Sequence, residues 1–162
     1  MGRFLIISLV LFSVNSCTTY TPLYKDVTEY KYFLQNLFIK TDDNKISKNI
    51  KNELLRNLPS IKDIKYILFL ETNVSTSSTV NNIDGKISGY ELETVVKAKL
   101  YKRLRFDKLI YSFEEKANSP YYLTSEEVLS TLASRNNAIE LNTKNLSKKL
   151  YNSLIIFISQ EN

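Results

Sequence analysis

The sequence predicts an α+β fold in which two helices pack on one face of a four-stranded, mainly antiparallel sheet, in the order β-α-β-β-β-α. Two patterns predict this class. Apolar and polar residues alternate along residues 88–105, which is the period of a half-buried strand. Apolar residues recur every three or four positions in residues 45–58 and 128–157, which is the period of an amphipathic helix. With 162 residues, the chain is long enough for one ordinary domain.

The first strand and the first helix follow one another closely. The aromatic and apolar residues 30–40 are typical of a strand. Residues 45–58 form the first predicted helix, and Pro59 ends it. We interpret Asp42, Asp43 and Asn44 as the turn and N-terminal cap of this helix. The apolar stripe of the helix consists of Ile46, Ile50, Leu54, Leu55 and Leu58.

Three more strands are predicted after the first helix. Residues 66–75 form the second strand, and Asp84–Gly85 marks a turn. Residues 88–105 form the third strand, and residues 106–116 form a fourth that pairs with it as a hairpin and ends before Pro120. The buried face of the third strand is predicted to carry Tyr90, Leu92, Thr94, Val96, Ala98, Leu100 and Leu104.

A long helical pattern closes the chain. Thr124 and Glu127 have the spacing of a capping box, which begins a helix. Apolar residues keep the helical spacing as far as Phe157, and neither Gly nor Pro interrupts them. The pattern is consistent with one long helix or with two in tandem that meet near Asn136–Asn137.

The N-terminus has the order of regions found in a secretory signal. Arg3 is followed by an apolar run that is shorter than the roughly 20 residues needed to span a membrane. The residues before Cys17 resemble a bacterial lipobox, in which the Cys is acylated and becomes the first residue; the alternative is an ordinary signal with an incidental Cys. We therefore expect a signal peptide at residues 1–16, a lipidated Cys and tether at 17–29, and a single domain at 30–162.

Composition excludes several classes of function. The chain has no His, one Cys and three Gly. Without His it has no His-based acid–base catalysis and no Ser-His or Cys-His pair, and most zinc sites are excluded. Three Gly cannot supply a glycine-rich phosphate loop. We expect neither a catalytic residue nor a metal site. The net charge of +5 favours an anionic partner such as nucleic acid, phosphorylated lipid or an acidic protein.

One row of residues on the polar face of the third strand is the candidate binding site. Alternate residues of a strand lie on one face, about 6.6 Å apart. A row of cations at this spacing suits phosphates or acidic side chains, and Arg can bind phosphate with two parallel hydrogen bonds. The alternative is a solvated strand face that charge keeps soluble. The candidate row consists of Lys97, Lys99, Tyr101, Arg103 and Arg105.

Four stretches resemble the LPS-assembly lipoprotein family of Gram-negative bacteria. The first runs from Cys17 through Pro22-Leu23-Tyr24, and the second is the helix at residues 45–58. The third is the hairpin at residues 90–113. The fourth is the closing helix at residues 121–157, with Ala-Ser-Arg near its centre.

The resemblance implies a non-enzymatic role. Such a lipoprotein is held in the outer membrane by acyl chains, palmitate among them, on the residue that matches Cys17. It would need no other cofactor. Its partner would be the outer-membrane β-barrel that translocates LPS, which it plugs and helps to assemble from the periplasmic side and the barrel lumen. LPS itself is a further expected contact, and nucleic acid is not expected. The alternative is a lipid-anchored periplasmic module that binds a small anion or assists another transporter.

Overall fold

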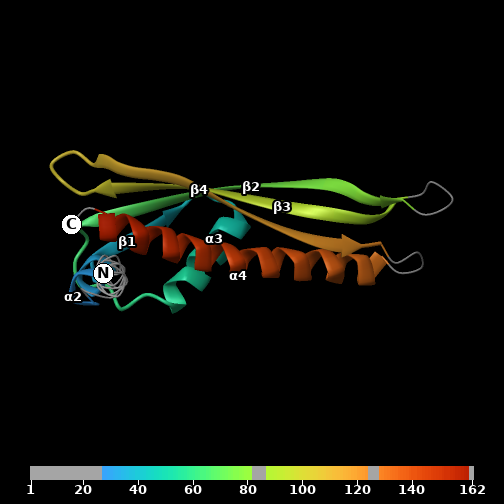
Figure 1. Cartoon of the computed structure of the whole chain (residues 1–162), viewed down its shortest axis with the longest axis horizontal. Helices are drawn as coiled ribbons and strands as arrows, with labels where there is room; N and C mark the ends of the chain where they lie inside the picture. The colour runs from blue at the N-terminus through green and yellow to red at the C-terminus, as the bar shows by residue number, and fades with distance from the viewer. Residues whose placement is uncertain (1–26, 82–86, 124–127, 161–162) are drawn as a thin grey trace, which may run out of the picture.

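We describe a computed structural model of the chain, in which residues 27–81, 87–123 and 128–160 are defined. The long strands and the last helix run along the long axis of an elongated molecule (Figure 1). The elements are α2 (Val27–Gln35), β1 (Leu37–Thr41), α3 (Lys45–Arg56), β2 (Tyr66–Asn81), β3 (Ile87–Lys102), β4 (Lys108–Tyr122) and α4 (Val128–Gln160).

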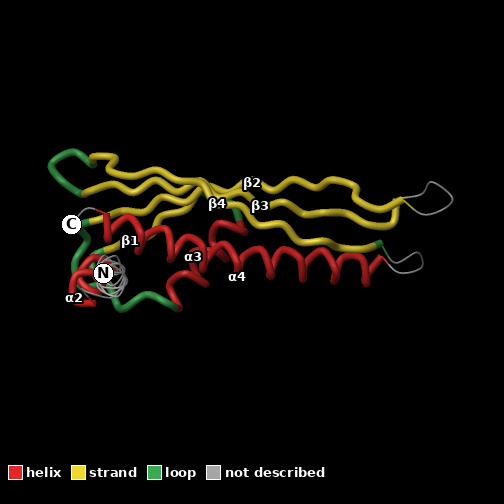
Figure 2. Tube along the Cα trace, in the orientation of Figure 1, coloured by secondary structure: helices red, strands yellow, loops and turns green. Residues whose placement is uncertain are grey.

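The four strands form one sheet in the order β1-β2-β3-β4. β1 runs parallel to β2, whereas β3 is antiparallel to both β2 and β4. α3 and α4 lie on the same face of this sheet, and no described element covers the opposite face (Figure 2). The predicted α+β class, with two helices on a mainly antiparallel sheet, is therefore confirmed. We call the uncovered side the open face.

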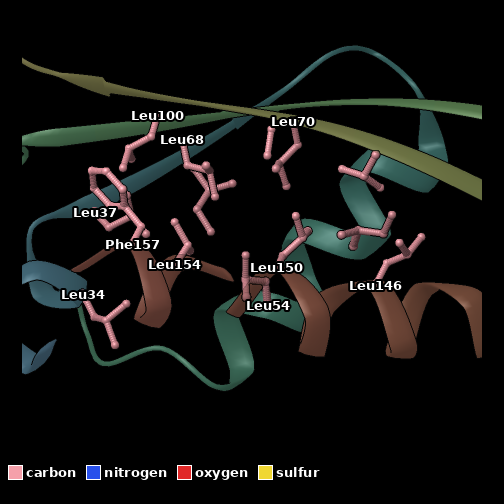
Figure 3. Close-up of a cluster of buried hydrophobic side chains, with 14 of the residues drawn as sticks. Leu34, Leu37, Leu54, Leu68, Leu70, Leu100, Leu146, Leu150, Leu154 and Phe157 are labelled. Carbon is pink, nitrogen blue, oxygen red and sulfur yellow. The ribbon is translucent and has the colours of Figure 1, made fainter. Parts of the chain in front are cut away.

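A cluster of leucines joins the sheet to the two helices that cover it (Figure 3). Burying a Leu side chain contributes about 1.5–3 kcal/mol, so this cluster dominates the stability of the fold. It occupies the half of the molecule where β1 and α3 lie. Its fully buried members include Leu37, Leu54, Leu68, Leu70, Leu100, Leu146, Leu150 and Leu154.

A polar network holds the other half of α4 to the sheet. Asn142 is fully buried, and its Nδ2 donates to the carbonyl oxygen of Leu92 at 2.9 Å and to Oγ1 of Thr94 at 3.1 Å. Ser119 Oγ donates to Asn142 Oδ1 at 2.7 Å. A single amide thus joins α4 to β3 and β4, beyond the leucine cluster. The helix is continuous from Val128 to Gln160, so the long pattern is one helix and not two.

The first predicted strand, residues 30–40, is wrong over its first half. Residues up to Gln35 belong to α2, and β1 begins only at Leu37. Phe33 and Leu34 are buried and Tyr30 packs against the same core, a spacing of three and four residues that fits a helix, so a short apolar run does not distinguish the two structures. Asn36 ends the helix: its Nδ2 donates to the Tyr32 carbonyl oxygen at 2.7 Å.

The β3–β4 hairpin has different limits from those predicted. β3 ends at Lys102, so Leu104, which was expected on the buried face, lies in the connection and is exposed. β4 continues through Pro120, which pairs with Glu91, to Tyr122. β4 is an edge strand, where the missing N–H of a proline is tolerated.

The other described boundaries lie within three residues of those predicted, except the end of β2. α3 ends at Arg56, two residues before the expected end, and Asn44 is its N-cap, as predicted, because its Oδ1 accepts the Ile46 N–H at 2.9 Å. β2 is longer than expected and reaches Asn81. The signal peptide, Cys17, the turn at Asp84–Gly85 and the capping box at 124–127 lie outside the described residues.

Candidate functional site

The open face of β3 carries the strand part of the predicted row. Val96, Ala98 and Leu100 are completely buried beneath the helices, so the residues between them point to the opposite side. Lys97 and Lys99 therefore lie on the open face, as the alternation predicts. They do not have the same surroundings, because the neighbouring strands place different residues beside each of them.

Lys97 is flanked by acidic residues. It pairs in register with Glu71 on β2 and with Glu114 on β4. Glu114 also forms a salt bridge with Lys116, with 3.4 Å between Oε1 and Nζ. Lys97 forms no salt bridge among the described residues, but opposite charges on adjacent strands attract, so the two carboxylates in register lower the positive potential around it. Lys97 is thus a poor candidate for binding an anion from outside the chain.

Lys99 has no such balance. It pairs with Phe69 on β2 and with Ser112 on β4. Beyond Phe69, the register of β1 brings Lys40 into the same row. Among the described residues, no salt bridge forms to Lys40 or Lys99. Two lysines on either side of an aromatic ring therefore form a cationic position that sequence reasoning missed, because it depends on strand register.

Tyr101 lies in the next row of the open face and has apolar neighbours. It pairs with Ile67 on β2 and with Leu109 on β4. Ile67 is buried, and Leu109 is half exposed. The open face thus changes along β3 from alternating charge at Lys97 to an apolar strip at Tyr101, which ends at the hairpin.

Arg103 and Arg105 belong to the connection and not to the strand. The Arg103 N–H donates to the Lys65 carbonyl oxygen at 2.8 Å, which fixes the start of the connection against the segment before β2. Both arginine side chains are exposed, and within the described chain neither forms a salt bridge. The structure therefore divides the predicted row into three parts: Lys97 between two carboxylates, Lys99 and Tyr101 on the strand without acidic partners in register, and two arginines on the hairpin.

Two of the grooves that the described residues form lie on the helical side and are considered as ligand sites. One has a volume of about 740 Å³ and is mainly apolar, and the other has a volume of about 760 Å³ and carries amides and charges between α3 and α4. The apolar groove is lined by Tyr30, Lys31, Leu34, Arg56, Asn57, Leu58, Pro59, Tyr151, Asn152, Ile155 and Ile156.

A metal-binding cluster and a membrane-spanning helix are both absent from the described ranges. No group of three or more acidic, His or Cys side chains there is arranged to hold a metal ion. Of the helices in those ranges, none combines the length and the apolar character needed to cross a membrane.

No family model matches the sequence, and no curated protein matches it either. Solved structures do share the fold. A protein of Caulobacter crescentus, described as a candidate lipoprotein, is 11% identical, with a TM-score of 0.63 and coverage of 82% of this chain and 97% of that one. Rare lipoprotein B of Shewanella oneidensis is 15% identical, with a TM-score of 0.61 and coverage of 78% and 98%. An uncharacterized lipoprotein B of Nitrosomonas europaea is 12% identical, with a TM-score of 0.62 and coverage of 76% and 83%.

Proposed function

We propose that this chain is an outer-membrane lipoprotein that acts as plug and assembly partner of the β-barrel that translocates LPS. The observation that carries the proposal is the fold, which lipoproteins share across more than three quarters of this chain. The lipobox-like residues before Cys17 supply an independent reason to expect an acyl anchor. The protein would face the periplasm and the barrel lumen and would work without catalysis or a cofactor beyond the lipid.

The open face of β3 and the connection that follows it supply the proposed contacts. A side chain that meets a barrel wall or an LPS phosphate must present a charge that its own fold leaves unbalanced. Lys99, Arg103 and Arg105 meet this condition, and Tyr101 adds an aromatic surface beside them. Lys97 does not meet it, so we now assign the contact to the other four residues of the row.

Depletion in the host tests the assembly role. Loss of an assembly partner should leave the barrel misfolded, so we expect a lower amount of folded barrel and less LPS on the cell surface. The measurements are heat-modifiability of the barrel on gels and surface labelling of LPS. A plasmid copy should restore both. Unchanged levels of folded barrel and surface LPS after complete depletion would contradict the proposal.

The apolar groove favours a second candidate function. Ligand sites are usually concave and mainly apolar with a few polar groups, and this groove has both properties. A lipid-anchored module that binds a small amphiphilic anion would use it, with Lys31 and Arg56 near the charge. Native mass spectrometry of the protein purified from its host tests this candidate, since a retained small molecule would support it over the plug.

A further inference from the structure

The connection between β3 and β4 has an unusual composition for a hairpin turn. We call residues 102–108, with the sequence KRLRFDK, the hairpin tip. It carries four cations and a single acidic residue, Asp107. Between the two arginines and the acid lie Leu104, which is 55% exposed, and Phe106, which is 82% exposed. Turns normally use Gly, Pro, Asn, Asp and Ser, and the tip holds only one of these.

Folding does not account for these apolar side chains. Neither Leu104 nor Phe106 belongs to a core cluster, and a Phe that stays exposed contributes little of its burial energy. The two antiparallel strands on either side could be joined by a two-residue polar turn. The exposed ring and the cations around it therefore point to a partner outside the chain.

The position of the tip narrows the choice of partner. It projects from the same end of the molecule at which α2 and the C-terminal end of α4 lie (Figure 1). Val27, where α2 begins, is ten residues after Cys17, a stretch that spans at most about 35 Å when fully extended. If Cys17 is acylated as proposed above, the anchor and the tip can meet the same membrane surface.

We propose that the hairpin tip docks into the surface of a bilayer that is rich in anionic phospholipid. Leu104 and Phe106 would enter the boundary between headgroups and acyl chains, where exposed apolar side chains of peripheral proteins lie. Arg103 and Arg105 would bind the phosphates, as would the lysines that flank the tip. Their long aliphatic stems allow the charges to stay in the headgroup layer while the apolar residues go deeper.

The absence of tryptophan from the chain allows a direct test, because a single introduced Trp is the sole indole signal. The variant Phe106→Trp places it on the tip. The matched control Leu129→Trp places it on an equally exposed apolar residue, 79% exposed, near the start of α4 at the opposite end of the molecule. Each protein is purified as its host makes it and reconstituted into vesicles of phosphatidylethanolamine and phosphatidylglycerol, with and without brominated acyl chains.

We expect brominated lipid to quench the emission of Phe106→Trp by roughly twofold or more and its spectrum to shift to shorter wavelength, because the ring lies at the acyl boundary. Leu129→Trp should stay unquenched. Adding Arg103→Gln and Arg105→Gln to Phe106→Trp should reduce the quenching on the vesicles that contain phosphatidylglycerol. On vesicles of phosphatidylcholine alone, quenching should be weak with or without the two arginine changes.

Three outcomes would overturn the proposal. In the first, Phe106→Trp on phosphatidylglycerol vesicles keeps the emission of a water-exposed indole and is quenched by aqueous iodide. In the second, both Trp variants are quenched equally. In the third, Phe106→Trp is quenched only when LPS is added to the vesicles, so the tip binds LPS, as the proposed function allows for its arginines, and not phospholipid. The vesicles otherwise contain neither barrel nor LPS, so failure here is distinct from failure of the proposed plug role.

Discussion

The surroundings of a single side chain decide what it can bind. Lys97 and Lys99 are two positions apart on one strand and lie on the same face. Glu71 and Glu114 face the first, whereas Phe69 and Ser112 face the second. Carboxylates in register therefore offset the charge of Lys97, and none is in register with Lys99. The candidate row was predicted from β3 alone, and its division became evident only when the neighbouring strands were placed.

Charge reversal tests the arginines of the row. We expect Arg103→Glu with Arg105→Glu to weaken binding of purified protein to LPS by roughly tenfold or more, because charge-assisted hydrogen bonds to phosphate are replaced by repulsion. The measurement is titration of fluorescent LPS at fixed salt. The urea midpoint should barely change, since both side chains are exposed and outside salt bridges in the described chain.

The matched control is Lys45→Glu with Lys148→Glu, which makes the same change in net charge at two exposed helical positions. It should leave LPS binding nearly unchanged. If both double variants weaken LPS binding equally, net charge and not the two arginines controls the binding of LPS. If neither double variant weakens LPS binding, the row is not an LPS site.

At the level of elements, periodicity predicted what is long and regular. The alternation along β3 and the helical stripes of α3 and α4 were found with nearly correct limits. The prediction failed at α2, where Tyr30, Phe33 and Leu34 have a helical spacing within an apolar run that also suits a strand. The position of Phe106 could not be predicted either, because the alternation of apolar and polar residues does not mark the residue at which β3 ends.

The two sides of α4 give a prediction for this element. Leu150 is fully buried in the leucine cluster, and Leu141 on the same helix is 53% exposed. We expect Leu150→Ala to lower the free energy of unfolding by about 2–5 kcal/mol, through lost burial and a cavity. Leu141→Ala should change it by less than about 0.5 kcal/mol. Urea unfolding followed by circular dichroism compares them, and equal losses would contradict the observed packing of α4.

For the whole molecule, the absence of His makes stability insensitive to pH near neutrality. Hydrogen bonding to Lys144 lowers the pKa of Glu140. The stability that this shift contributes to the fold is therefore present above the normal pKa of 4.5 and is lost as the pH falls through the lowered pKa. The pKa of Lys65 is raised by its hydrogen bond to Tyr32, and the pKa of Lys144 is raised by its hydrogen bond to Glu140. The stability that these two shifts contribute is present below the normal pKa of 10.5 and is lost as the pH rises through the raised pKa values.

These three shifts all move titration away from neutral pH. We therefore expect the urea midpoint to stay constant between about pH 5.5 and 7.5 and to fall only outside this range. Unfolding measured across this interval at constant ionic strength checks the expectation. A steep change near pH 6.5 would contradict the expectation.

As a whole, the molecule is proposed to work inside or against a large β-barrel. The most direct test is to purify the tagged protein from detergent-solubilised membranes of its own host and to identify by mass spectrometry what co-purifies. We predict the outer-membrane LPS barrel at about one copy per copy of this protein, retained after a salt wash. Recovery without any barrel, or with an inner-membrane transporter instead, would contradict the claim and favour a binding module that uses the apolar groove.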